Sequence, residues 1–135
     1  MGTGTLIDSS ALIAAERDGG DLETLLAPFE RERVAVAAIT VAELLHGMLR
    51  ASSELRRSRR ERFVEEVLSS VPVLAFDLEV ARLYTRLWVD LQAVGAPIGA
   101  HDLMIAATAL CRGFRLLTHN ARHFQRIEGL ELIVA

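Results

Sequence analysis

Short apolar runs alternate along this chain with longer segments in which apolar residues recur every three or four positions. The short runs lack the apolar–polar alternation of a strand with one solvent-facing side, so we expect each to be a strand buried on both faces. Strands are predicted at residues 5–7, 34–39, 71–76, 114–118 and 130–134.

The longer segments have the period and the end signals of helices. Ser9 or Ser10 can cap the first helix and Asp77 a later one, while Gly95 and Gly113 follow two of the helix ends. Helices are predicted at residues 9–17, 22–30, 40–49, 53–69, 77–94 and 102–112. Strands that alternate with helices are typical of a parallel sheet covered on both faces. We therefore predict a single three-layer α/β domain over residues 1–135, with a central, mainly parallel sheet of four to five strands.

Composition narrows the function classes. The 135 residues are 51% hydrophobic and 24% charged, with a mean hydropathy of +0.29 and a net charge of −3, which is typical of a folded domain. All 15 basic residues are arginine, so lysine-dependent chemistry such as a P-loop or a Schiff base is excluded. Cys111 is the only cysteine, which excludes a disulfide framework. Residues 1–5 show no signal-peptide pattern and no apolar run is long enough to span a bilayer, so we expect a cytoplasmic protein without a membrane partner.

Three acidic residues stand near the ends of predicted strands. Asp8 directly follows the first strand, Glu43 lies one turn into the helix after the second, and Asp102 opens the helix before the fourth. Thr118 and Asn120 come where that fourth strand ends. Ligands of open α/β folds bind beyond the carboxyl ends of the strands, so we expect these side chains to converge there.

Each acid also has a purely structural interpretation. Asp8 and Asp102 are suited to helix starts, and Thr40-x-x-Glu43 has the pattern of a capping box. Three carboxylates about 5 Å apart, however, repel one another by roughly 3 kcal/mol per pair at an effective dielectric constant of about 20. Caps alone do not draw acids together against that repulsion, whereas a divalent cation offsets it. An all-oxygen site favours Mg²⁺ or Mn²⁺, which can bind a phosphodiester and activate water.

Four motifs follow one another along the chain, and together they cover most of its length. They are Leu6-Ile7-Asp8-Ser9-Ser10-Ala11-Leu12-Ile13-Ala14, Thr40-x-x-Glu43-Leu44-x-x-Gly47, Asp102-x-x-Ile105-Ala106-Ala107 and Leu117-Thr118-x-Asn120-x-x-x-Phe124. As a set they resemble the PIN-domain family, and most of all the VapC-type ribonuclease toxins of bacterial toxin–antitoxin pairs. The resemblance implies a Mg²⁺-dependent endoribonuclease (Mn²⁺ is the other candidate metal) that forms a homodimer and is inhibited by a cognate antitoxin. By position, the family's metal-binding acids match Asp8, Glu43 and Asp102, and the hydroxyls around them match Ser9 or Ser10 and Thr118.

The chain departs from the family pattern after the fourth strand, where members often carry a further acid. Asn120 and His123 stand at the corresponding positions. Whether the site holds one metal ion or two is therefore open. A role for Asn120 in orienting a water or holding Asp8 fits better than direct metal ligation.

One dense basic segment lies in the helix predicted at residues 53–69. Arg56, Arg60, Phe63 and Val67 form a stripe that is apolar only in its second half. We hypothesise that Arg56 and Arg60 overhang a cleft and contact RNA phosphates or an acidic segment of an antitoxin. The alternative is a solvated helix start stabilised by pairs of arginine and glutamate four residues apart.

Other functions remain to be weighed. An acid-pocket phosphatase also begins with an Asp at a strand end, but it needs a lysine and a second Asp where Ser10 stands. A non-catalytic interaction module could use the same fold. His101, His119 and His123 invite a zinc site, but their spacing is not that of a zinc motif. Polar surface beside an active cleft is the preferred interpretation of these histidines.

Overall fold

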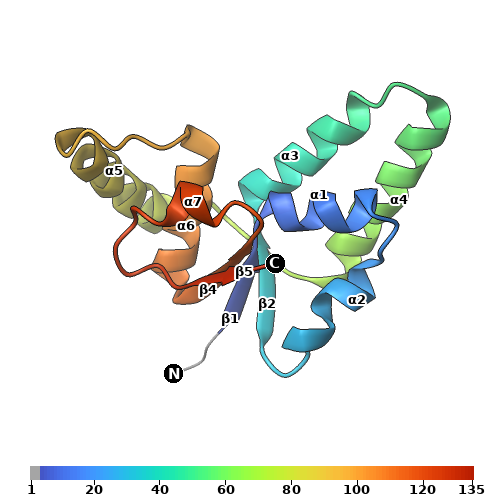
Figure 1. Ribbon diagram of the computed structural model, residues 1–135, viewed down its shortest axis with the longest axis horizontal. Coiled ribbons are helices and arrows are strands. Elements are labelled where there is room, and N and C mark those ends of the chain that lie inside the picture. The colour runs from blue at the N-terminus through green and yellow to red at the C-terminus, as the bar shows by residue number, and fades with distance from the viewer. Residues whose placement is uncertain (1–3) are drawn as a thin grey trace.

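The computed structural model describes residues 4–135, in which five strands form one parallel sheet (Figure 1). The order β3-β2-β1-β4-β5 means that the chain winds outward from β1 to β3 and then returns to the other side of β1. The winding direction reverses between β1 and β4, which is where ligand sites form in open α/β sheets. The predicted three-layer α/β fold is confirmed, with five strands: β1 (Gly4–Ile7), β2 (Arg33–Ala37), β3 (Val73–Leu74), β4 (Phe114–Thr118) and β5 (Leu132–Val134).

Helices cover both faces of the sheet, and Figure 1 shows them as two separate groups. One group comprises α1 (Ser9–Arg17), α2 (Leu22–Leu26), the 3₁₀ turn η1 (Ala27–Phe29), α3 (Ala38–Leu49) and α4 (Glu54–Ser70). The other comprises α5 (Leu78–Ala93), α6 (Ala100–Arg112) and α7 (Ala121–Phe124).

Alternate residues of the central strands divide between two hydrophobic cores. Leu6 of β1 and Leu116 of β4 pack with α5, α6 and α7. Their neighbours Ile7 and Leu117 pack with α1 to α4. Successive side chains of a strand point to opposite faces of the sheet, so strands that lack polar alternation fill both cores.

Several element ends differ from the prediction for identifiable reasons. The predicted strand at residues 34–39 ends at Ala37, and α3 begins at Ala38, because apolar residues suit the buried face of either element. The strand predicted at residues 71–76 shortens to two residues at the sheet edge, where its one partner among the described strands is β2. The short helix α7 was not predicted because four residues are too few to show a helical period.

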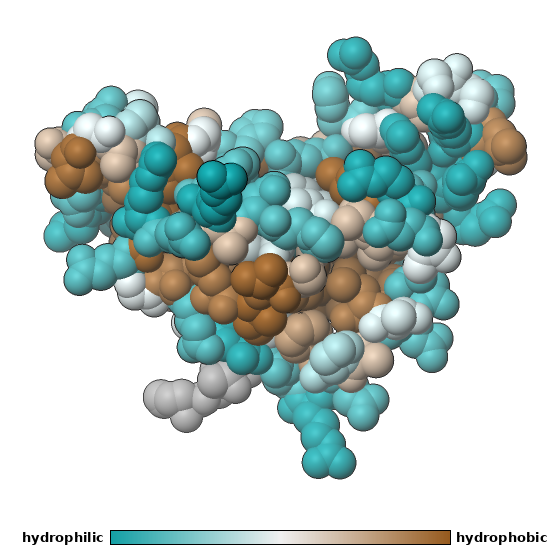
Figure 2. Space-filling view, viewed as in Figure 1, coloured by the Kyte–Doolittle hydropathy of each residue, from teal (hydrophilic) through white to brown (hydrophobic). Residues whose placement is uncertain are grey.

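The two helical groups leave the molecule hollowed between them. In Figure 1 the α5 region and the α3–α4 pair project as two arms, and Figure 2 shows the hollow between these arms above the sheet. Hydrophilic side chains dominate the arms, whereas apolar atoms gather at the centre of this face (Figure 2). Within residues 4–135, no helix is long and apolar enough to cross a membrane.

Candidate active site

Asp8 is the most buried of the predicted site acids, with 2% of the residue exposed. Asp8 occupies the N-cap position of α1, and its side chain makes no capping hydrogen bond. The prediction that Ser9 or Ser10 caps this helix is therefore wrong. Asp8 Oδ2 instead accepts hydrogen bonds of 2.7 Å from the hydroxyls of Ser10 and Thr118. The capping interpretation therefore does not account for this carboxylate.

The two hydroxyls are themselves held by the backbone after β4. Ser10 Oγ accepts the His119 N–H at 3.0 Å, and Thr118 Oγ1 accepts the Asn120 N–H at 2.8 Å. A hydroxyl carries one proton, and in this arrangement both protons point to Asp8 Oδ2. The backbone thus orients the hydroxyls, and the hydroxyls orient the carboxylate. Asn120 acts here through its backbone amide.

The second oxygen of Asp8 is the exception in this network. Asp8 Oδ1 is buried and has no hydrogen-bond partner within residues 4–135. A buried charged oxygen without a partner is costly, and such atoms are rare unless a ligand or ion completes them. The donor set around Asp8 thus fits an oxygen-seeking cation at Oδ1.

Glu43 lies in the second turn of α3, whose N-cap is Ala37. The capping-box interpretation of this residue is wrong, because Thr40 lies inside the helix. The Glu43 side chain reaches the start of two other helices: its Oε1 accepts from Ser9 Oγ at 2.8 Å, and its Oε2 lies 3.3 Å from His101 Nδ1.

Asp102 lies in the first turn of α6, which begins two residues earlier than predicted, at Ala100. Its Oδ2 lies 2.9 Å from Nδ1 of His123, which α7 carries. The sequence indicated polar surface at the histidines but did not predict the contacts of His101 with Glu43 and of His123 with Asp102. The sequence hints at these contacts in only two ways: His101 adjoins Asp102, and His123 stands where family members often carry an acid.

Hydrogen bonds and chain adjacency thus bring the predicted acids to one edge of the sheet. Asp8 adjoins Ser9, which bonds Glu43; Glu43 contacts His101, which adjoins Asp102. In the part of the chain that the structure describes, however, no group of three or more His, Cys, Asp or Glu side chains is arranged to hold a metal ion. Glu43 and Asp102 each direct one oxygen to a histidine.

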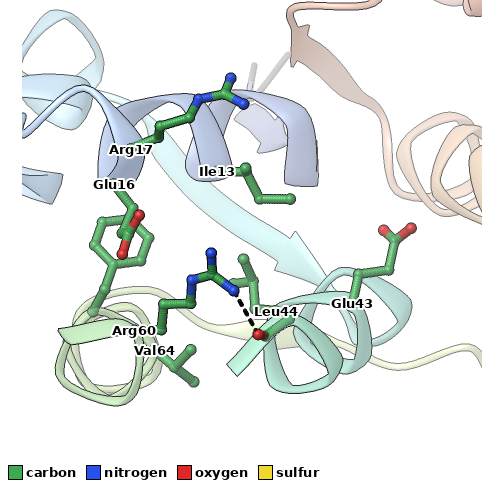
Figure 3. A pocket seen from close by; sticks show the side chains of 9 residues that line it. Ile13, Glu16, Arg17, Glu43, Leu44, Arg60 and Val64 are labelled. Carbon is green, nitrogen blue, oxygen red and sulfur yellow. Dashed lines mark hydrogen bonds between the residues drawn. The ribbon is translucent and has the colours of Figure 1, made fainter. Parts of the chain in front are cut away.

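A pocket of about 260 Å³ opens beside Glu43, between α1, α3 and α4 (Figure 3). Its lining includes apolar side chains and Arg60, whose guanidinium donates a 2.7 Å hydrogen bond to the Gly47 carbonyl. Arg56 bonds instead to Ser52 at 3.3 Å. The two arginines of the predicted stripe thus have different surroundings, and of the two only Arg60 lines the pocket. The apolar lining consists of Ile13, Leu44, Phe63 and Val64.

Comparison with known proteins identifies the family. Residues 5–130 match the family model described as PIN domain. The chain belongs to the PIN-domain family. This PIN domain is 38% identical over 130 residues to Ribonuclease VapC1 of Rickettsia felis, covering 96% of this chain and 95% of that protein.

Two further comparisons place the PIN domain in the VapC group. It is 34% identical over 100 residues to the tRNA(fMet)-specific endonuclease VapC of Salmonella typhimurium, with 74% of each chain covered. It superimposes on the crystal structure of DNA-bound VapBC from Salmonella typhimurium with a TM-score of 0.86, 26% identity and 98% of each chain covered. The predicted resemblance to VapC-type PIN domains is confirmed.

Proposed function

We propose that this PIN domain is a Mg²⁺- or Mn²⁺-dependent endoribonuclease, the toxin of a toxin–antitoxin pair, that hydrolyses RNA phosphodiester bonds. The observation that carries the proposal is the buried Oδ1 of Asp8, which has no partner among the described residues, beside the firmly held Oδ2. The names of the VapC relatives support the ribonuclease activity.

Asp8, Glu43 and Asp102 would hold the cation, and carboxylate oxygens are the ligands that Mg²⁺ and Mn²⁺ prefer. When bound, the cation supplies Lewis-acid activation of the scissile phosphate and of water. The chain's own contribution is orientation. Ser10 and Thr118 hold Asp8, and Ser9 holds Glu43 at a distance of 2.8 Å.

The pocket beside Glu43 supports the antitoxin as a partner. Its apolar floor offers burial to a partner's side chains, and Arg60 at its wall offers a cation to an acidic group. An occupant of this pocket would stand next to the proposed metal ligand, and it would block RNA from the site. The homodimer stays a prediction.

The test compares Asp8→Asn with the matched control Asp90→Asn, an exposed acid on α5. Purified proteins are incubated with RNA that includes a tRNA(fMet) transcript, in Mg²⁺, in Mn²⁺ and in EDTA. We expect cleavage by the wild type and the control in either metal, none in EDTA, and a loss of at least about 100-fold in Asp8→Asn. Metal-dependent cleavage that survives Asp8→Asn would refute the proposal.

One observation favours a second candidate, a non-catalytic interaction module. Among residues 4–135, no group of three or more metal-binding side chains is preassembled. Calorimetric titration of the purified protein with Mg²⁺ separates the two functions, because a non-catalytic module would release or absorb no heat of Mg²⁺ binding and would not cleave RNA. The phosphatase alternative loses further support. It requires a second acid at position 10, and the residue there, Ser10, instead donates a hydrogen bond to Asp8.

A further inference from the structure

We propose that His101 and His123 are positioning residues for the two outer acids, each imidazole fixing the orientation of one carboxylate at the metal site. The inference rests on the proposed function and deepens it. It stands on two contacts, between His101 and Glu43 and between His123 and Asp102.

Glu43 is held from two sides by residues of two other helices. Ser9 at the start of α1 donates to Oε1 at 2.8 Å, and His101 at the start of α6 contacts Oε2 at 3.3 Å. A long acidic side chain that is 28% exposed has many rotamers to choose from. Contacts to both oxygens set the plane of its carboxylate and hold it between the starts of α1 and α6.

In the described part of the chain, the Asp102 carboxylate has a single hydrogen-bond partner. Its Oδ2 lies 2.9 Å from His123 Nδ1, and within residues 4–135 its Oδ1 has no hydrogen bond. His123 is itself placed by the next residue, Phe124, which is fully buried and anchors the short helix α7 in the core. The position of α7 thus gives Asp102 a defined orientation, with one oxygen left for a cation.

The chemistry of the partners fixes the direction of both hydrogen bonds. An ionised carboxylate only accepts, so Nδ1 of each imidazole carries the proton. Such imidazole–carboxylate contacts orient metal ligands in many proteins. Within the described residues, His46 and His119 make no carboxylate contact, so the two histidines that do are those beside the site acids.

The experiment compares alanine with a conservative replacement at each position. The side-chain nitrogen of asparagine stands two bonds from Cβ, as Nδ1 of histidine does, so His123→Asn and His101→Asn retain the donor that His123→Ala and His101→Ala remove. His46→Ala, at an exposed position on α3, is the matched histidine control. Mg²⁺ binding is measured by isothermal titration calorimetry, and RNA cleavage is measured as a function of Mg²⁺ concentration.

We expect each alanine variant to weaken Mg²⁺ binding by about 10-fold or more, and each asparagine variant to stay within about 3-fold of the wild type. At saturating Mg²⁺ the alanine variants should recover a kcat close to that of the wild type, because the defect lies in ligand orientation. If a histidine serves folding alone, its replacement by alanine would lower the melting temperature and leave the Mg²⁺ affinity unchanged.

The outcomes separate this inference from the proposed function. A wild type that binds Mg²⁺ while both alanine variants bind it equally well overturns the inference alone. Asparagine variants as weak as the alanine variants also overturn it, because the Nδ1 donor is then not the operative group. A wild type that neither binds Mg²⁺ nor cleaves RNA overturns the proposed function and the inference with it.

Discussion

Asp8→Asn tests whether this carboxylate serves function at the expense of stability. The residue is 2% exposed, and Oδ1 has no partner within residues 4–135. A buried charge without a counter-charge costs about 3–5 kcal/mol, and asparagine removes that charge with almost the same shape. The amide can still accept both hydroxyl hydrogen bonds through its oxygen.

Three terms oppose this gain. The amide NH2 takes the buried place of Oδ1, which has no hydrogen-bond partner within residues 4–135, and an unmet donor there costs about 1–3 kcal/mol. The hydrogen bonds from Ser10 and Thr118 each weaken by about 1 kcal/mol when their acceptor becomes neutral, and the loss of the negative charge at the N-terminus of α1 costs about 0.3–1 kcal/mol. These terms nearly cancel the gain, so we expect the free energy of unfolding of Asp8→Asn to lie within about 2 kcal/mol of that of the wild type in the absence of divalent cations.

Mg²⁺ should make the wild type clearly the more stable of the two proteins. At a Mg²⁺ concentration about 100 times the Kd, the wild type gains about 2.7 kcal/mol, and the variant gains nothing. The assay is urea unfolding followed by circular dichroism, in EDTA and in excess Mg²⁺, with Asp90→Asn as the control. A variant that is more than about 3 kcal/mol less stable than the wild type in EDTA refutes the reasoning, because the charge would then hold the fold together.

Two further predictions concern the rest of the molecule. Glu32 accepts from the buried Thr5 hydroxyl and from Arg115 at 2.8 Å, and these partners, Thr5 first, lower the pKa of Glu32 below its ordinary value of 4.5. Stability from this carboxylate is therefore complete above pH 4.5 and lost as pH falls through the lowered pKa. Glu32→Gln should cost about 1–3 kcal/mol at neutral pH and less in strong acid by urea unfolding, and an equal difference at both pH values contradicts this. In the pocket, Ile13→Glu should weaken antitoxin binding by about 10-fold or more in a titration with the antitoxin, whereas Val89→Glu on α5 should not; equal affinities would place the antitoxin elsewhere.

Buried strands were the part of the fold that the sequence predicted best. β4 has its predicted bounds and β1 is one residue longer, because both lie at the centre of the sheet with both faces covered. At the edge, β3 keeps only two residues of a six-residue apolar run. An edge strand has one neighbour, so an apolar run there can pack against helices without pairing.

The site was predictable as far as backbone topology determines it. Asp8 directly follows β1 and Thr118 ends the adjacent strand β4, so the parallel pairing of these strands in the native register brings the two residues together. The histidine contacts depend on side-chain rotamers of residues separated by 58 and 21 positions, and no local pattern records them. Likewise, the pattern Thr40-x-x-Glu43 does not distinguish a Glu43 that caps its own helix from one that accepts a hydrogen bond from Ser9 of another helix.

Sheet register couples this site to both hydrophobic cores. The Asp8 N–H donates to the Leu117 carbonyl at 2.9 Å, which extends the pairing of Ile7 with Leu117 by one step. A slip of one residue would exchange the faces of Leu6 and Ile7, and the same slip would carry Asp8 away from the Thr118 hydroxyl. The cores that favour the native register therefore also hold the hydrogen bond that orients Asp8. It follows that substitutions that loosen the pairing of β1 with β4 will disturb the acidic site without contacting it.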